Sequence, residues 1–335
     1  MLNLVIPTYR PHFNFNIKFL KSFYKHCLDR DDVTINFIIS DSEKKQFFEL
    51  IDPFLDIMHI KIHTLKDIVK ELFNENINEE TLLTKIGKHN LQSLKKIAGV
   101  YKLSNPYSLL FDAETLVIRD FKVQSLFDTY FNKNRCIYYT NNNYGNFTGI
   151  HKQITEDCLT ILQQKSGLPF YFFETYNWFF EKTILDDLFT EIELKNNCNM
   201  FDILTGKYEV IFETILYNLF IYFNKEKYNY KFICINDELH KIMGIEEYNK
   251  YKAHKDLPTA FEFHTKVLNN EYYYNVFKVF YNKHKLNFFK YGILNESQFS
   301  PYQIKFIEDT KCIIFLCTLW YVPELELNKL SKRII

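Results

Sequence analysis

Short apolar runs alternate with segments of helical periodicity throughout the N-terminal third of the chain, and this alternation limits the accessible folds more than any other feature. The apolar runs that predict β-strands span residues 2–6, 33–39, 59–65 and 109–111. The segments that predict helices span residues 13–28, 43–50, 67–73 and 90–103. Because strands that alternate with helices form βαβ crossovers, the sequence predicts an α/β fold with a mixed, mostly parallel sheet flanked by helices.

Polar residues stand at the carboxyl ends of three of the predicted strands. Thr8 follows the first strand, Asp41 the second and Asp112 the fourth. In doubly wound sheets, ligands bind in the crevice outside these strand ends. We therefore expect the three side chains to border one binding site.

A polar, turn-rich segment at 141–146 precedes a second half with a more mixed pattern. Further helices are predicted over 154–164, 177–189, 211–223 and 272–284, and further strands over 135–140, 232–235 and 312–319. The chain thus divides into a first half at 1–140 and a helix-rich second half at 141–335, which we expect to form one continuous domain.

The composition excludes several classes of protein. Of the 335 residues, 47% are hydrophobic and 24% are charged, which argues against a disordered chain and against an integral membrane protein. The 41 basic and 41 acidic side chains cancel, so no positive field favours a nucleic-acid partner. The seven cysteines have no CxxC spacing and indicate neither a zinc site nor a disulfide framework. No signal peptide or transmembrane segment is recognisable, so the cytoplasm is the expected location.

The sequence Asp112-Ala113-Glu114 places two carboxylates one residue apart at the end of a predicted strand. At a frayed strand end such a pair can flank one divalent cation, and Mn²⁺ or Mg²⁺ suits oxygen ligands of this kind. The cation would bridge a diphosphate and offset the charge that develops on a departing phosphate group. A strand-end turn with two solvated acids is the alternative that the motif alone leaves open.

Three features together resemble glycosyltransferases of the GT-A type. They are the loop at 6–10 after the first strand, Asp41 after the second strand, and the segment YSLLFDAETLVIRDF at 107–121 behind a helix. The resemblance implies a GT-A-like, Rossmann-related fold. It also implies that residues 1–140 bind a nucleotide sugar and that residues 141–335 bind the acceptor.

The resemblance also assigns roles to individual residues. It implies that the loop and the acid after the second strand hold the nucleobase and ribose, and that the two acids of the DxD-like motif bind the metal. Carried over, the first role falls on Pro7, Thr8, Tyr9 and Asp41, and the second on Asp112 and Glu114. The last acid of the motif is Glu rather than Asp, which lengthens its arm. Asp112 is therefore expected to coordinate directly, and Glu114 to act directly or through water.

Four further polar residues lie near this predicted nucleotide site. The helix before the DxD-like motif carries Gln92, Lys95 and Lys96 within two turns, where a lysine would meet the sugar or diphosphate of a donor. Arg10 would suit a phosphate through its forked guanidinium. For each of these residues a solvated surface position is the alternative.

Glu213 and Tyr217 lie four residues apart on an otherwise apolar helix, so they share one face. The segment is similar to an acid-plus-Tyr element of bacterial and viral GT-A-like enzymes, in which the acid faces the acceptor. The resemblance implies that Glu213 is a general base for the acceptor hydroxyl and that Tyr217 contacts the acceptor. A helix-edge acid paired with a lysine is the alternative.

Two more segments are candidates for the second half of the site. The aromatic stretch at 170–178 has the composition of a surface that stacks on sugar rings, and we assign Glu174, Tyr176 and Trp178 to acceptor binding. An aromatic core segment is the alternative. Enzymes of the resembled class often draw a third metal ligand from a C-terminal histidine, and His264 is the candidate. His240 and His254 compete for that role, and a structural histidine is the commoner explanation.

We thus expect a metal-dependent glycosyltransferase of the hexosyltransferase type that acts in polysaccharide biosynthesis. Its donor would be a nucleoside-diphosphate sugar, first of all a UDP-sugar, and its acceptor a hydroxyl of a glycan or lipid-linked molecule. Peripheral contact with the inner face of the membrane stays open, because the C-terminal tail at 330–335 is basic and apolar. The alternatives are a nucleotidyltransferase, which the absence of a Gly-rich loop at 6–9 disfavours, and a non-catalytic carbohydrate-binding protein.

Overall fold

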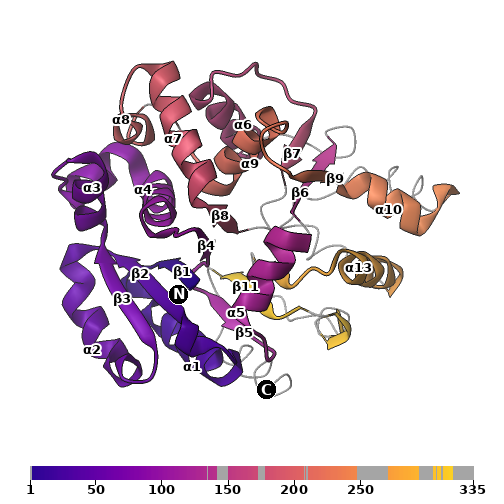
Figure 1. The fold of residues 1–335 in the computed structure, drawn as a ribbon, viewed down its shortest axis with the longest axis horizontal. Coiled ribbons are helices and arrows are strands. Elements are labelled where there is room, and N and C mark those ends of the chain that lie inside the picture. The colour runs from indigo at the N-terminus through magenta and orange to yellow at the C-terminus, as the bar shows by residue number, and fades with distance from the viewer. Residues whose placement is uncertain are drawn as a thin grey trace.

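A computed structural model describes residues 2–133, 135–141, 150–172, 178–206, 208, 210–246, 271–293, 305–306, 308–310 and 312–319. These residues form a mixed α/β fold in which helices flank a mostly parallel central sheet (Figure 1), as the sequence predicts. None of the helices in the described part of the chain combines the length and apolar character needed to cross a membrane.

The central sheet has five strands in the order β3-β2-β1-β4-β8. These strands are β1 (Leu2–Pro7), β2 (Val33–Ile39), β3 (His59–Thr64), β4 (Tyr107–Leu110) and β8 (Phe179–Glu181). The strands β1, β2, β3 and β4 run parallel, whereas β8 pairs antiparallel with β4. All seven residues of β2 are buried, because a parallel sheet with helices on both faces leaves little strand surface exposed.

Four helices cover this sheet. They are α1 (Phe13–His26), α2 (Lys44–Leu55), α3 (Leu65–Phe73) and α4 (Glu79–Leu103). In Figure 1, α1 and α2 lie on one side of the sheet, while α3 and α4 lie on the other. The chain therefore crosses from one face of the sheet to the other before it enters β4. In the sheet, β1 lies between β2 and β4. Such a reversal of strand order is where doubly wound folds bind ligands.

Two glycines shape α4, the helix that contributes most to the site described below. Gly87 has a φ of +78°, a conformation that glycine adopts without strain, and it bends the helix. Farther along, a Cβ added to Gly99 would lie 2.0 Å from Ile38 Cδ1. The missing side chain thus lets α4 approach β2 closely.

The remaining elements form the second half of the fold and two small sheets. The helices are α5 (Val123–Phe127), α6 (Ile150–Ile161), α7 (Lys182–Asn196), α8 (Met200–Leu204), α9 (Glu213–Phe223), α10 (Ile235–Met243) and α13 (Glu271–His284). The small sheets are β7-β6-β9, from Phe170–Phe172, Cys136–Asn141 and Lys231–Cys234, and β10-β11-β5, from Phe288–Ile293, Ile314–Leu319 and Thr115–Val117. Short helical turns occur at η1 (Arg10–His12), η2 (Arg30–Asp32), η3 (Asp41–Glu43) and η4 (Asp128–Lys133). The apolar α9 packs against α4, α6 and α7.

The structure corrects one predicted element. The sequence predicts a helix over 177–189, but Phe179–Glu181 is the strand β8 and the helix α7 begins only at Lys182. The backbones of Tyr107 and Leu109 in β4 pair with this strand, and its side chains are buried. A tertiary contact thus overrides the local helical spacing.

Candidate functional site

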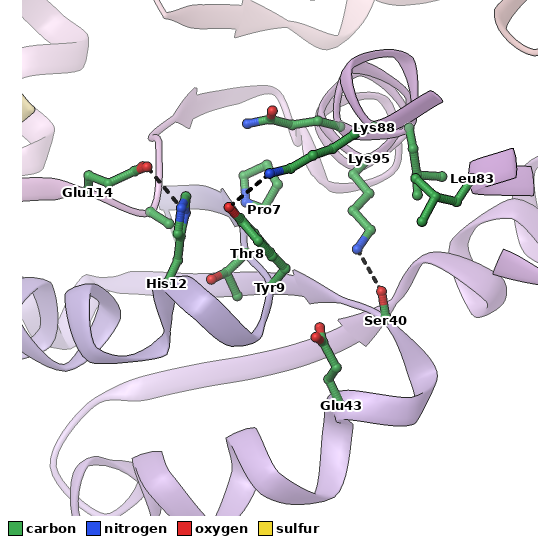
Figure 2. Close-up of a pocket in the computed structure, with 13 residues that line it drawn as sticks. Pro7, Thr8, Tyr9, His12, Ser40, Glu43, Leu83, Lys88, Lys95 and Glu114 are labelled. Carbon is green, nitrogen blue, oxygen red and sulfur yellow. Dashed lines mark hydrogen bonds and ion pairs between the residues drawn. The ribbon is translucent and has the colours of Figure 1, made fainter. Parts of the chain in front are cut away.

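A pocket of about 280 Å³ opens where the carboxyl ends of β1, β2 and β4 meet α4 (Figure 2). It lies at the point where the strand order reverses, the expected ligand position in such a sheet. Its lining consists of Pro7, Thr8, Tyr9, His12, Ser40, Glu43, Leu83, Lys88, Leu91, Gln92, Lys95, Ala113 and Glu114.

The sequence Asp112-Ala113-Glu114 forms a tight turn between β4 and β5, two strands that belong to different sheets. Thr115 closes the turn, since its backbone N–H and its hydroxyl donate to the Asp112 carbonyl oxygen over 3.1 and 2.7 Å. Ala113 and Glu114 line the pocket. Asp112 lies beside it, with 12% of its side chain exposed. Because the chain passes from one sheet to another at this turn, the carboxylates of Asp112 and Glu114 both lie at the end of β4.

Asn16, a buried residue of α1, ties the turn to the loop after β1. Its Oδ1 accepts a hydrogen bond from Thr8 Oγ1 over 2.6 Å, and its Nδ2 donates to the Ala113 carbonyl oxygen over 3.2 Å. Asn16 is not among the site residues predicted from the sequence. Its spacing is the signal that could have identified it, because a polar residue three positions before Phe19 falls on the buried face of α1.

One end of the pocket is built by Ser40, Glu43 and Lys95. Lys95 Nζ donates to Ser40 Oγ over 2.9 Å, as Figure 2 shows. The backbone N–H of Arg10 donates to Glu43 Oε1 over 3.0 Å, whereas the buried Glu43 Oε2 has no hydrogen-bond partner among the described residues. This end of the pocket therefore offers a carboxylate acceptor beside an ammonium donor.

Burial lowers the pKa of Lys95, although the nearby carboxylates of Glu79 and Glu43 oppose the shift. The Glu79 carboxylate lies 3.9 Å from Lys95 Nζ, too far for a hydrogen bond. The ammonium is thus desolvated and incompletely neutralised, so an anionic ligand group in the pocket would stabilise it.

The other wall is formed by Tyr9, His12, Lys88 and Glu114. Lys88 Nζ donates to the Tyr9 hydroxyl over 3.3 Å, and the rings of Tyr9 and His12 lie 4.1 Å apart between centroids. His12 Nδ1 lies 3.2 Å from Glu114 Oε1. Dashed lines in Figure 2 mark the Lys88–Tyr9 and His12–Glu114 contacts.

The pKa of His12 is lowered to about 4, mainly by burial and also by Lys88, while the charge of Asp112 opposes the shift. The imidazole is therefore neutral at pH 7. Its contact with Glu114 is then a hydrogen bond that Nδ1–H donates to the carboxylate, which assigns the tautomer from the geometry.

Behind the pocket, Lys96 Nζ lies 2.9 Å from Asp112 Oδ1 and 3.0 Å from Glu213 Oε1. Burial disfavours the charge on Lys96, but the two carboxylates outweigh it and raise the pKa of Lys96. Burial and the charge of Asp112 raise the pKa of Glu213, while Lys96 lowers it. The Lys96 ammonium thus pairs with the carboxylates of both Asp112 and Glu213 and remains charged.

The segment before Glu213 is held against α4. Asn90 accepts from the Ile211 N–H over 2.9 Å and donates to the Tyr208 carbonyl oxygen over 3.0 Å. The Val210 N–H donates to Asp157 over 2.9 Å. These bonds fix the chain where it enters α9, so Glu213 meets Lys96 in a defined geometry.

The pocket brings together many of the residues predicted from the sequence, but not all. Those that line it are Pro7, Thr8, Tyr9, Gln92, Lys95 and Glu114. Arg10 is exposed and contributes no lining atoms. Asp41 is also outside the lining, whereas Glu43, two residues farther along the chain, lines the pocket. Lys96 does not line the pocket, and its Nζ contacts Asp112 Oδ1 over 2.9 Å.

The predicted acceptor residues in the described region are buried. Tyr217 accepts a hydrogen bond from the Glu181 N–H over 3.0 Å, and Trp178 packs against Lys96, whose Nζ is 5.0 Å from the ring centroid. Neither lines the pocket. Glu213 is 1% exposed and likewise does not border it. Glu174, Tyr176 and the proposed third metal ligand His264 lie outside the described residues.

Within the described ranges, no cluster of three or more His, Cys, Asp or Glu side chains could hold a metal ion. The two carboxylates of the turn nevertheless have the chemistry of a Mn²⁺ or Mg²⁺ site. Asp112 already has an ammonium beside it, and Glu114 a ring N–H. Asp112 Oδ1 thus faces an ammonium, and Glu114 Oε1 faces a neutral N–H donor.

The fold and the pocket define a mixed α/β protein with a ligand-sized cavity at the strand ends. No protein-family model matches the chain, and no curated protein does. Mouse xyloside xylosyltransferase 1 in its apo form is similar at 10% identity, over 71% of this chain and 86% of that chain, with a TM-score of 0.39. S. aureus TarS in complex with UDP is similar at 11% identity, over 85% of this chain and 72% of that chain, with a TM-score of 0.34. Core-mannan synthase A from Aspergillus fumigatus in its Mn/GDP form is similar at 9% identity, over 66% of this chain and 69% of that chain, with a TM-score of 0.35.

Proposed function

We propose that this protein is a glycosyltransferase that binds a nucleoside-diphosphate sugar in the pocket and transfers the sugar to a hydroxyl group. The observation that carries the proposal is the meeting of three strand ends in one cavity. The loop at 7–9, the Ser40–Glu43 turn and the Asp112–Glu114 turn all converge there, at the reversal of strand order.

The end of the pocket formed by Ser40, Glu43 and Lys95 suits a nucleoside. Glu43 Oε2 can accept a hydrogen bond from a ribose hydroxyl or a base N–H, and Lys95 can donate to an oxygen of the ligand. These groups are buried or half-buried, so each hydrogen bond to a ligand would also satisfy a poorly solvated polar atom.

The diphosphate would lie toward Gln92 and the Asp112–Glu114 turn. A divalent cation, Mn²⁺ or Mg²⁺, would be held there by Asp112 and Glu114, and His264 remains the proposed third ligand. Such a cation offsets the charge of a departing nucleoside diphosphate. In the transfer, the bond from the anomeric carbon to the phosphate oxygen breaks, its electron pair leaves with the diphosphate, and the acceptor oxygen bonds to that carbon.

The acceptor hydroxyl must also lose its proton to a base. Glu213 was the candidate, and a general base has to lie within hydrogen-bond reach of the hydroxyl. In this structure Glu213 instead holds Lys96 behind Asp112. Its role as base therefore remains a prediction, as do the UDP-linked hexose, the glycan or lipid-linked acceptor and the cytoplasmic location.

The proposal is tested by calorimetric titration of the protein with UDP, GDP and CMP in the presence of Mn²⁺, followed by assays of UDP-, GDP- and CMP-sugar hydrolysis. We expect one nucleotide to bind and its sugar to be hydrolysed slowly without acceptor. Asp112→Asn should reduce hydrolysis at least about a hundredfold if the carboxylate helps to stabilise the leaving group. Asp186→Asn, a substitution of a half-exposed acid on α7, should leave it unchanged. If no nucleotide binds and Asp112→Asn behaves like Asp186→Asn, the proposal is wrong.

A further inference from the structure

Lys96 links the proposed cation site to a buried acid of the second half of the chain. Its Nζ is nearly equidistant from Asp112 Oδ1 at 2.9 Å and Glu213 Oε1 at 3.0 Å. The three side chains come from α4, from the turn after β4 and from the first residue of α9. The contact thus joins elements that are distant in sequence.

The surroundings leave little room for solvent at this contact. The side chain of Lys96 is 6% exposed and that of Glu213 is 1% exposed. The rings of Trp178 and Phe212 have centroids 5.0 and 5.4 Å from Lys96 Nζ and cover the ammonium further. A buried ammonium with two carboxylate partners is held firmly, because water cannot replace either partner.

We propose that Lys96 is the resident counter-ion of Asp112, and that a divalent cation binds Asp112 only in competition with the Lys96 ammonium. Glu213 retains the ammonium when Asp112 turns to the cation. This inference rests on the proposed function, since it concerns the cation that assists the nucleotide-sugar donor. It makes Lys96 a positioning residue that sets the affinity of the site for the cation.

Electrostatics explains why the two positive charges compete. A divalent cation on Asp112 would repel an ammonium bound to the same carboxylate, and the repulsion is strong where water is excluded. Glu213 is already in contact with Nζ, so the ammonium can keep one partner while it gives up the other. Without Glu213, release of Asp112 would leave a buried unpaired ammonium, which is costly.

Direct measurement of Mn²⁺ affinity without nucleotide tests the inference, with free Mn²⁺ quantified by electron paramagnetic resonance. Lys96→Met removes the competing ammonium, so we expect Mn²⁺ to bind at least about tenfold more tightly than to the wild type. Lys96→Arg retains the positive charge and should bind close to the wild type. Glu213→Gln leaves Asp112 as the one carboxylate for Lys96, so Mn²⁺ should bind more weakly.

The double variant Lys96→Met/Glu213→Gln separates competition from simple charge attraction. If Glu213 acts through Lys96, its removal weakens Mn²⁺ binding in the wild type but hardly changes it once Lys96 is gone. If Glu213 attracts the cation through space, the loss is equal in both backgrounds. The double variant also carries fewer unpaired buried charges than Lys96→Met, so it serves if Lys96→Met fails to fold.

Mn²⁺ binding that is equal or weaker in the folded Lys96→Met variant, or in the double variant relative to Glu213→Gln, overturns the inference. So does the absence of Mn²⁺ binding in every variant. Asp112→Asn must also abolish Mn²⁺ binding, because only then is the measured ion bound at Asp112. Failure of the proposed function would appear separately, as a lack of nucleotide binding in proteins that still show the expected order of Mn²⁺ affinities.

Discussion

Asn16 donates a hydrogen bond from Nδ2 to the carbonyl oxygen of Ala113 over 3.2 Å, and so joins the first helix of the chain to the centre of the Asp112–Glu114 turn. The same side chain accepts from Thr8 Oγ1 over 2.6 Å. Two walls of the pocket are therefore held by one buried amide. Because a buried amide satisfies partners on both sides, its loss leaves both of them unpaired.

Asn16→Ala should lower the free energy of unfolding by about 1–3 kcal/mol, the usual cost of leaving buried polar groups unpaired. It should also weaken nucleotide binding, because the loop at 7–9 and the turn lose their connection. The matched control is Ser22→Ala on the same helix, where the hydroxyl donates to the Phe19 carbonyl and accepts from the Val117 N–H away from the pocket. Urea unfolding and calorimetry give both quantities. Equal nucleotide affinities in the two variants would refute the positioning role.

The structure and the sequence pattern make different predictions about which acid after β2 binds the nucleotide, Glu43 or Asp41. Glu43 lines the pocket and Asp41 does not, although Asp41 is the acid directly after the second strand. Glu43→Gln should weaken nucleotide binding about tenfold, as expected when a hydrogen bond to a charged acceptor is lost. Asp41→Asn should bind like the wild type. The opposite order of the two affinities would support Asp41, the acid predicted from the sequence, as the nucleotide-binding residue.

Lys95 should contribute to binding while contributing little to stability. Its ammonium is buried, and burial lowers the pKa of this side chain, so the folded protein carries a desolvation cost that an anionic ligand would offset. Lys95→Met should weaken nucleotide binding about tenfold or more without lowering the melting temperature. Lys85→Met, at an exposed position on the same helix, is the control and should change neither quantity. A lower melting temperature with unchanged binding would show that Lys95 has a structural role.

The sequence was sufficient to predict the central strands and the place of the pocket, because both depend on local patterns. The apolar run of β2 identifies a buried strand, and strand ends identify the ligand edge. Tertiary contacts decided the rest. The η3 turn rotates the chain after β2, so Glu43 faces the pocket instead of Asp41. The strand β8 has only three residues and depends on its pairing with β4.

Lys95 and Lys96 illustrate the same limit on one helix. Neighbouring helical residues point about 100° apart, so only one of the two can face the pocket. Lys95 lines it, whereas Lys96 meets Asp112 and Glu213. The choice depends on how α4 is rotated against the sheet, and that rotation is set by contacts such as the close approach at Gly99. No pattern in the helix itself contains this information.

Asn90 should affect turnover more than donor binding. It holds the segment that leads into Glu213 through hydrogen bonds to the Ile211 N–H and the Tyr208 carbonyl oxygen. Asn90→Ala should cost about 1–3 kcal/mol of unfolding free energy and reduce turnover, with a nearly unchanged dissociation constant for the nucleotide. Asn196→Ala loses two similar bonds, to the Ile161 and Ile192 carbonyl oxygens, and should reduce stability alone. Equal turnover in the two variants at matched stability would argue against a positioning role for Asn90.

His12 should make the stability of the protein depend on pH in the acid range. Burial is the main cause that lowers its pKa from 6.5 to about 4, so between these values the unfolded chain binds a proton that the folded chain does not. Stability therefore falls as the pH drops from about 6.5 to about 4. Below that range His12 is protonated in both states, so the loss of stability that it causes does not increase further. His12→Gln removes the titrating group while keeping a side chain that can donate to Glu114. The melting temperature of the wild type relative to His12→Gln should thus decline steadily as the pH falls from 7 to 4. A difference that stays constant over this range would mean that folding leaves the pKa of His12 unchanged, which would contradict the prediction. A difference that rises as the pH falls from 7 would mean that His12 is protonated in the folded protein and forms an ion pair with Glu114.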